Sequence, residues 1–122
     1  MRQFELKRTL SGADITAQVT VLDEGVHILI CGGTQPHIGA VSVVDPAGIC
    51  ATTQFPGHKD GNVSEQWAKA LSEAGYCPAA VIAGIHYDKI GKDQICTVLE
   101  LNNQLICSAI AELRGARKEA FL

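Results

Sequence analysis

A glycine-rich segment between two apolar runs constrains the fold of this chain more than any other feature. Residues Val26 to Cys31 are almost all apolar, and the run stops at Gly32-Gly33. A polar turn follows, and Gly39 then opens a second apolar run from Ala40 to Val44. Glycine adopts backbone conformations that other residues avoid and lets another molecule approach the main chain closely. The segment therefore predicts a tight loop between two buried strands, which is a common position for a binding site.

Strand patterns fill most of the first half of the chain. Residues Asp14 to Leu22 alternate strictly between polar and apolar side chains, which is typical of a half-buried antiparallel strand. Five more segments have the composition of strands, namely Phe4–Leu10, Val26–Cys31, Ala40–Val44, Ile49–Thr53 and Ala79–Ile85. Turn residues separate several of them and predict turns at Ser11-Gly12, Asp23-Glu24-Gly25 and Asp45-Pro46-Ala47-Gly48.

Two helices are predicted from apolar residues at helical spacing. The first spans about Val63 to Ala74, with Asn62 as its N-cap, Glu65 completing a capping box and Gly75 ending the helix. The second runs from near Lys92 to about Arg114. Together these elements predict an α+β fold with a mostly antiparallel sheet of five or six strands and two helices.

Composition bounds the class of protein. The 122 residues suffice for a single domain, with a core over about residues 4–113 and a flexible tail at 114–122. The net charge of −3, without a long basic cluster, argues against nucleic-acid binding. No apolar run approaches the ~18 residues of a membrane span, and the N-terminus lacks a signal-peptide core. An odd number of cysteines, five, without a signal peptide indicates reduced thiols and hence a cytoplasmic protein. No pair has Cys-x-x-Cys spacing, which argues against a cysteine-based zinc site.

The first candidate site is the glycine loop itself. Successive backbone N–H groups in such a loop can form a concavity that binds a phosphate. Thr34 could add a hydroxyl donor, and His37 a donor or a proton. The alternative is a strand connection whose glycines only relieve steric crowding. A Walker loop and a dinucleotide fingerprint are both excluded, because no Gly-Lys-Ser/Thr ending is present and a strand follows instead of a helix.

A second candidate site precedes the first predicted helix. His58 and Lys59 could bind an anion there with the help of the helix dipole, or they could simply lie in a solvated loop. For Asp60 and Asn62, a solvated loop with a good helix cap is the better explanation.

A third candidate site follows the strand that ends at Ile85. A carboxylate at Asp88 could hold His86 in one tautomer for acid–base work, although such residues more often stabilise a loop. His37 and His58 could converge with His86 on a metal ion, but their spacing matches no known motif, so no metal site is predicted. No serine occupies a nucleophile elbow and no thiol has an obvious activating base, so no catalytic residues are predicted.

Three blocks of sequence together resemble a small bacterial family. The blocks are Gly32 to Val41, Pro56 to Asp60 and Ala83 to Asp88, and the resemblance covers roughly Phe4 to Leu113. The family consists of D-type small proteins encoded with UbiD-type gallate and protocatechuate decarboxylases, and its members are described as chaperones for prenylated flavin mononucleotide. The resemblance implies a fold like that of the proteasome assembly chaperones, with an antiparallel sheet flanked by helices, and a homodimer.

The same resemblance implies a function and a set of ligand-binding residues. The protein would be a non-enzymatic carrier that binds reduced prenylated flavin mononucleotide through its phosphate and delivers it to a UbiD-type decarboxylase, with a flavin prenyltransferase as a further partner. A dissociation constant near micromolar, about −8 kcal/mol, would permit both capture and release. The implied cofactor-binding residues are Gly32, Gly33, Thr34, Pro36, His37, Gly39, His58, Lys59 and His86.

Two other functions remain open. The chain could be a structural small subunit or assembly factor of the decarboxylase with no ligand of its own. The apolar face of the last helix, which carries Asn102, would then be an interface, or that face could only cover its own sheet. The chain could also be a small enzyme, such as an isomerase or hydrolase, that uses His37 and His86. Binding of flavin phosphates to the purified protein distinguishes the carrier from the structural subunit. If the chain is an enzyme, replacing either histidine by alanine should abolish turnover and leave flavin binding intact.

Overall fold

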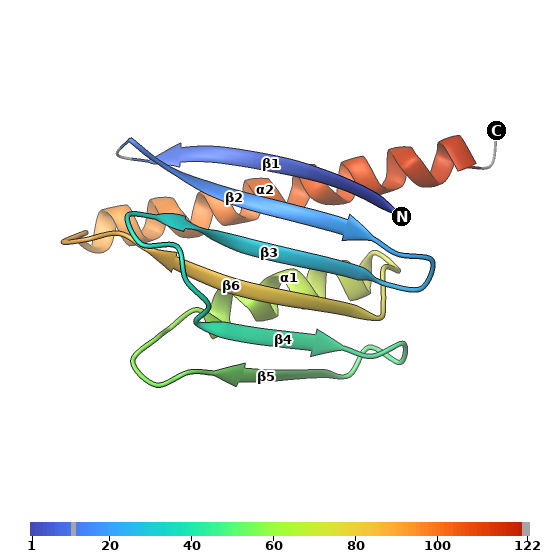
Figure 1. Ribbon diagram of the computed structural model, residues 1–122, viewed down its shortest axis with the longest axis horizontal. Helices are drawn as coiled ribbons and strands as arrows, with labels where there is room; N and C mark the ends of the chain where they lie inside the picture. Colours follow the sequence, from blue (N-terminus) through green and yellow to red (C-terminus); the bar gives the residue numbers. More distant parts are fainter. Residues whose placement is uncertain (11, 121–122) are drawn as a thin grey trace.

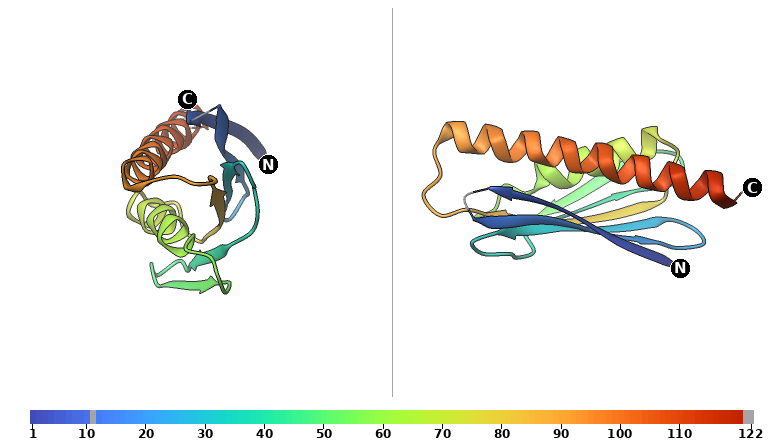
Figure 2. Two further views of the ribbon diagram at one scale, coloured as in Figure 1. Left: turned by 90° about the vertical axis from the view of Figure 1, so that its left-hand side faces the viewer. Right: turned by 90° about the horizontal axis from the view of Figure 1, so that it is seen from above.

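The computed structural model describes the backbone of residues 1–10 and 12–120 and the side chains of these residues up to position 115. Its elements follow one another as β1 (Arg2–Leu10), β2 (Ala13–Val21), β3 (Val26–Gly33), β4 (Ala40–Val44), β5 (Cys50–Gln54), α1 (Gly61–Glu73), β6 (Ala79–His86) and α2 (Lys92–Ala120). Both helices lie on one face of a single sheet, and among the described residues no helix covers the other face (Figure 2). The predicted α+β fold is confirmed, and all the predicted strands form to within two residues of their expected ends.

The sheet is mixed, with the strand order β1-β2-β3-β6-β4-β5 (Figure 1). Neighbouring strands are antiparallel except for β3 and β6, which are parallel. Although β6 is the last strand in the sequence, it lies between β3 and β4, inside the sheet. Its run of small and branched apolar residues suits this position, because a strand with neighbours on both sides tolerates few polar groups. The mostly antiparallel sheet expected from the sequence therefore contains one parallel pair.

The predicted turns have the backbone expected of them. Gly25 has a φ of 112° in the β2–β3 connection, which is the left-handed region that glycine favours. In the β4–β5 connection the N–H of Gly48 donates to the carbonyl of Asp45 at 2.9 Å, which closes a four-residue turn. Of the predicted Ser11-Gly12 turn, Ser11 lies outside the described residues.

The core lies between the helices and the sheet face that they cover. The alternation of β2 places Ile15, Ala17 and Val19 there, each 1% exposed or less. From the helices, Trp67 of α1 and Leu105 of α2 are 0% exposed. The inward face predicted for β2 is therefore confirmed. Helix α1 packs on β4, β5 and β6, whereas α2 packs on β1 and on α1.

The start of α1 differs from the prediction. The helix begins at Gly61, and Asp60 at its N-cap makes no side-chain capping bond. The predicted cap Asn62 and its partner Glu65 lie inside the helix, so the predicted capping box is wrong. The reason lies in the tertiary structure, because the carboxylate of Asp60 bonds to His37 and to the N–H of Ile85 instead of to the first N–H groups of the helix. Gly75, with a φ of 86°, follows the helix as predicted.

Helix α2 starts at Lys92 as predicted but extends to Ala120, beyond the expected end near Arg114. Residues 116–120 are Ala, Arg, Lys, Glu and Ala, all good helix formers, so only the preceding glycine opposes continuation. Residues 121–122 of the predicted tail lie outside the described residues, and the flexibility of the tail stays a prediction. Within the described part of the chain, no helix is long and apolar enough to cross a membrane.

A buried polar contact joins the two helices. Asn102 of α2 is 0% exposed, and its Oδ1 accepts a hydrogen bond from the indole Nε1 of Trp67 at 2.6 Å. Its Nδ2 donates to Oε1 of Gln66 at 3.1 Å. The face of α2 around Asn102 therefore packs within the protein. This packing supports the alternative in which the part of the face around Asn102 covers its own fold.

Candidate ligand-binding site

The parallel pairing of β3 with β6 brings the three candidate loops to one end of the sheet. Gly33 at the end of β3 is paired with His86 at the end of β6. Strand β4 begins at this same end, and β5 returns to it. Loops 34–39, 55–60 and 87–91 therefore meet there, and α1 and α2 both begin there (Figure 1). Three segments that are distant in the sequence thus become neighbours, which periodicity alone did not predict.

A pocket of about 320 Å³ lies between these loops and the first turns of α2. Four of the predicted site residues line it, namely His37, His58, Lys59 and His86. Most of the remaining wall is apolar and consists of Val63, Ile85, Ile90, Ile95, Val98 and Leu99. The volume falls at the lower end of the ~300–1,000 Å³ typical of small-molecule sites. The pocket therefore combines groups that can carry positive charge with an apolar wall.

His37 and Asp60 form a hydrogen-bonded pair in this wall. Nε2 of His37 lies 3.0 Å from Oδ2 of Asp60, whose side chain is 8% exposed. The other carboxylate oxygen accepts the backbone N–H of Ile85 at 3.0 Å. Nδ1 of His37 lies 2.9 Å from the carbonyl oxygen of Gln35, so this nitrogen carries a hydrogen. The prediction that Asp60 lies in a solvated loop is wrong, since both of its oxygens have partners inside the protein.

His58 lies beside this pair. Its ring stacks on that of His37 with a centroid separation of 4.5 Å and an interplanar angle of 30°. His86 lines the same pocket, but its Nε2 pairs with Oδ1 of Asp88 at 3.0 Å, as the nearby carboxylate predicts. The side chains of that second pair are 48% and 64% exposed, which suits a loop contact better than acid–base catalysis. His37 and His58 therefore lie together, whereas His86 is paired separately with Asp88.

The glycine loop does not offer its backbone as a phosphate cradle. Its N–H groups instead extend the hydrogen bonding of the sheet onto β6. The donors are Thr34, Gln35, His37 and Gly39, and the acceptors are the carbonyl oxygens of residues 83, 84 and 86, at 2.7–3.5 Å. An N–H group that is already bonded to a carbonyl is not available to an anion. The predicted concavity of loop N–H groups is therefore wrong at these positions.

The glycines instead permit close approach between segments. A Cβ on Gly33, whose φ is 82°, would overlap the carbonyl of His86. A Cβ on Gly39 would overlap the carboxylate of Asp60, and one on Gly32 would overlap the β2 backbone. These three glycines let the loop lie against the strands and against the His37–Asp60 pair. The structure thus supports the alternative in which the glycines relieve crowding.

The other two loop residues predicted to bind ligand have different positions. The Thr34 hydroxyl donates to the carbonyl of His86 at 3.3 Å and accepts the N–H of Asp88 at 3.2 Å, so it joins two loops. Pro36 is exposed and does not line the pocket. Both residues shape the loop more than the pocket.

Sequence reasoning missed the contribution of α2 to the pocket. Ile95 and Leu99 are 47% and 37% exposed at the rim, beside the buried Val98. The helical spacing of apolar residues places all three on one face of the helix. Nothing in the sequence shows which turn of that helix lies over a pocket. Tyr87 was also assigned no binding role. It lines the pocket although it is 5% exposed, and its hydroxyl donates to the carbonyl of Ala13 at 3.0 Å. Burial, and to a lesser extent a nearby carboxylate, raises the pKa of Tyr87.

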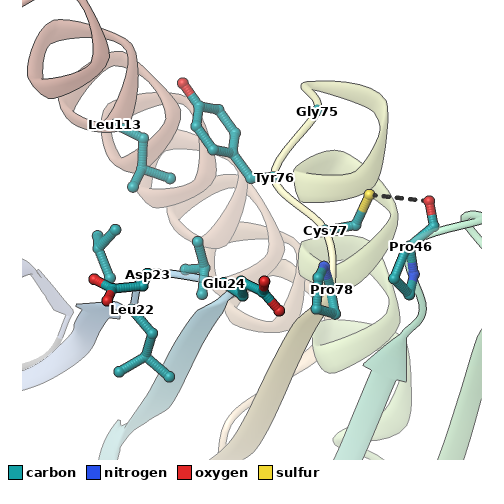
Figure 3. A pocket seen from close by; sticks show the side chains of 12 residues that line it. Leu22, Asp23, Glu24, Pro46, Gly75, Tyr76, Cys77, Pro78 and Leu113 are labelled. Atoms are coloured by element: carbon teal, nitrogen blue, oxygen red, sulfur yellow. Dashed lines mark hydrogen bonds between the residues drawn. The ribbon is translucent and has the colours of Figure 1, made fainter. Parts of the chain in front are cut away.

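A larger pocket of about 620 Å³ lies at the opposite end of the sheet, where β3 and β6 begin (Figure 3). Asp23 and Glu24 line it, and none of its lining residues is Lys, Arg or His. The thiol of Cys77, which also lines it, donates to the carbonyl of Pro46 at 3.6 Å (Figure 3). Two carboxylates without a cation disfavour an anionic ligand. The smaller pocket is the better candidate for a phosphorylated molecule despite its size.

A family model described as the prenylated flavin chaperone LpdD-like domain matches residues 9–114. The chain belongs to this family. Protein LpdD of Lactiplantibacillus plantarum is 32% identical over 112 residues, which cover 86% of this chain and 81% of that relative. The family expected from the three sequence blocks is confirmed, and membership gives the chain a chaperone role in the handling of prenylated flavin.

The smaller pocket fits a flavin nucleotide in chemical character. A flavin mononucleotide has a flat, largely apolar ring system at one end and a phosphate at the other. The wall of α2 and β6 residues suits the ring, and Lys59 with the neighbouring histidines suits the phosphate. The blocks on which the family resemblance rests meet at this pocket and not at the larger one.

Proposed function

We propose that this protein is a non-enzymatic carrier that binds reduced prenylated flavin mononucleotide in the smaller pocket and delivers it to a UbiD-type decarboxylase. The observation that carries the proposal is the convergence of the three family blocks on one pocket with a cationic rim and an apolar wall. The carrier works in the cytoplasm and receives its ligand from a flavin prenyltransferase.

The phosphate binds at the rim near Lys59. This side chain is exposed at the start of α1, where the helix dipole adds a favourable potential for an anion. His58 precedes it and supplies a second donor. The carboxylate of Asp60 is close by, but His37 and the N–H of Ile85 occupy its oxygens. Within the described part of the chain, Lys59 has no ion-pair partner, so its charge is available to the ligand.

The ring system covers the apolar wall. Ile95 and Leu99 are partly exposed in the protein alone, and a flat apolar ligand would remove them from water. The pocket is open on one side, so the ligand is held without being enclosed. Such a site suits a carrier, because a dissociation constant near micromolar, about −8 kcal/mol, permits transfer to a tighter-binding enzyme.

The proposal is tested by anaerobic titration of the purified protein with reduced prenylated flavin mononucleotide. Reduced unprenylated flavin mononucleotide and reduced riboflavin serve as comparison ligands. Lys59→Met should weaken binding of the phosphorylated ligands by roughly tenfold, about 1.4 kcal/mol, and should leave riboflavin binding unchanged. Lys69→Met, at an exposed position of α1 outside the pocket, is the matched control. Absence of binding to all three ligands would refute the carrier function.

The carrier step has its own test. Purified apo-decarboxylase should gain more activity from the loaded carrier than from the same quantity of free reduced cofactor. If the cofactor binds but activation does not improve, the protein stores the flavin without delivering it.

We also propose that the carrier is a homodimer that pairs through the uncovered sheet face. Leu29, Ile82 and Val41 are direct cross-strand neighbours on that face. Val43 beside them is 48% exposed. Val43→Glu should therefore shift the mass measured by light scattering toward the monomer. Thr53→Glu at the polar margin of the same face is the control.

This same face supports a second candidate function. An apolar surface without a covering helix could bind the decarboxylase directly, which is what a structural small subunit with no ligand of its own would do. Stable co-purification with the decarboxylase, together with no binding of any flavin, would favour this function over the carrier.

A further inference from the structure

We propose that His37, His58 and Asp60 bind a divalent first-row transition metal ion in the wall of the smaller pocket. The potential ligand atoms of these three side chains all lie within 4.8 Å of one another. They come from two loops, 34–39 and 55–60, that meet only in the folded protein. The inference concerns the protein alone and does not depend on the proposed flavin carrier.

The His37–Asp60 contact requires a positive species between its two atoms. Nδ1 of His37 donates its hydrogen to the carbonyl of Gln35 at 2.9 Å. A neutral ring in this tautomer presents a lone pair at Nε2, and this lone pair faces the carboxylate oxygen of Asp60 at 3.0 Å. Two acceptors at this distance repel each other unless a proton or a cation lies between them. The arrangement therefore holds either an imidazolium or a metal ion.

The backbone fixes both ligands in an orientation that suits a metal. Histidines that bind metals commonly donate their second ring N–H to a carbonyl, and ligating carboxylates commonly accept a further hydrogen bond. His37 makes the first contact with Gln35, and Asp60 makes the second with the N–H of Ile85 at 3.0 Å. The side chains of His37 and Asp60 are 22% and 8% exposed, so both are held with little freedom. A simple surface ion pair needs neither of these outer contacts.

The distances match those of a shared metal ion. Ligands at about 2.1 Å from one metal and 90° apart are separated by about 3.0 Å, which is the separation of the His37 and Asp60 atoms. Two imidazoles bound in the same way have their ring centroids about 4.5 Å apart, since each centroid lies about 3.2 Å from the metal. The rings of His37 and His58 are 4.5 Å apart. Bringing the His58 nitrogen within the ~4.2 Å that a shared metal allows requires a movement of less than about 1 Å.

The ligand set points to the class of metal. Two imidazoles and one carboxylate suit Mn²⁺, Fe²⁺, Co²⁺, Ni²⁺ or Zn²⁺, and they leave coordination positions open. All three residues line the pocket, so an oxygen of a bound phosphate could occupy an open position. This last step rests on the proposed function, whereas metal binding itself does not.

Cobalt titration of chelator-treated protein tests the proposal, with binding followed by calorimetry and by visible absorption. We expect one Co²⁺ per chain, a d–d spectrum, and no thiolate-to-metal charge-transfer band. His58→Ala and Asp60→Asn should each weaken binding at least tenfold. Asn at position 60 keeps an oxygen for the N–H of Ile85, so this variant tests the charge without removing the structural contact. His27→Ala, on the uncovered sheet face, should bind like the native protein.

Two results would overturn the proposal. The first is native protein that binds Co²⁺ and Zn²⁺ no better than the His58→Ala variant, which would mean that a proton closes the His37–Asp60 pair. The second is a charge-transfer band, which would place the metal on a cysteine such as the exposed Cys96 or Cys107. Circular dichroism confirms that each variant is folded. Because no flavin is present, failure here leaves the carrier function intact, and failure of flavin binding leaves the metal site intact.

Discussion

The bond between Trp67 and Asn102 should contribute a measurable part of the stability of this protein. Substituting Asn102 by Ala removes the acceptor of a 2.6 Å hydrogen bond and leaves an indole N–H at a side chain that is 0% exposed. A buried donor without a partner costs about 1–3 kcal/mol. The bond to Gln66 adds little, because Gln66 is exposed and its amide can bond to water.

Two smaller effects of this substitution have opposite signs. The cavity left by the shorter side chain costs about 1 kcal/mol, and the higher helix propensity of Ala returns about 0.6 kcal/mol. Asn103→Ala, one position along α2 and exposed, gains the same propensity without losing a buried bond. The difference between the two variants therefore isolates the tertiary contact. We expect Asn102→Ala to be less stable than Asn103→Ala by about 2–4 kcal/mol, or roughly 8–16 °C in Tm.

The assay is urea unfolding followed by circular dichroism and by fluorescence. The chain has a single tryptophan, so the fluorescence reports on the partner of the substituted residue. A cycle with Trp67→Phe, followed by circular dichroism, should give a coupling energy of about 1–2 kcal/mol. Equal stability of Asn102→Ala and Asn103→Ala would refute the reasoning, since the buried bond would then contribute nothing beyond helix propensity.

Two further predictions concern a close backbone contact and a shielded thiol. Gly84→Ala would drive a Cβ into the carbonyl of His37, so its Tm should fall by several degrees, whereas Gly91→Ala has open space around it and should stay within about a degree of the native protein. Burial raises the pKa of Cys31, so at pH 8 its thiolate is scarce and alkylation should be slower than at the exposed Cys107. Peptide mapping after limited alkylation measures the second effect, and faster reaction at Cys31 would contradict it.

The candidate site was only partly predictable, and the errors share a physical cause. Its loops were found because glycine, proline and histidine stand out between apolar runs. The burial of Asp60 was not found, because a carboxylate before a helix is usually a cap and its real partners lie far away in the sequence. Asp60 makes no capping bond to α1 for the same reason, since one of its carboxylate oxygens pairs with His37 and the other accepts the N–H of Ile85. The backbone N–H groups of the glycine loop were assigned to a phosphate, because nothing in the local sequence shows that carbonyl groups of β6 accept their hydrogen bonds.

The sequence by itself determined the local structure of this protein. Alternation of period two specified the faces of β2, apolar spacing of period 3.6 specified both helices, and glycine marked the turns. These patterns are local because backbone geometry and one buried face are enough to produce them. The family could also be identified from three short blocks, since binding loops keep their residues together along the chain.

Only the tertiary structure decided where those pieces meet. The insertion of β6 between β3 and β4, parallel to β3, placed three loops and the start of α2 around one pocket. It also brought His37 against Asp60 and left one face of the sheet uncovered. Strand order depends on the burial of whole faces and on long-range pairing, and neither leaves a signal in a short window of sequence. The chemistry of the site therefore came from the residues, and its geometry came from the topology of the sheet.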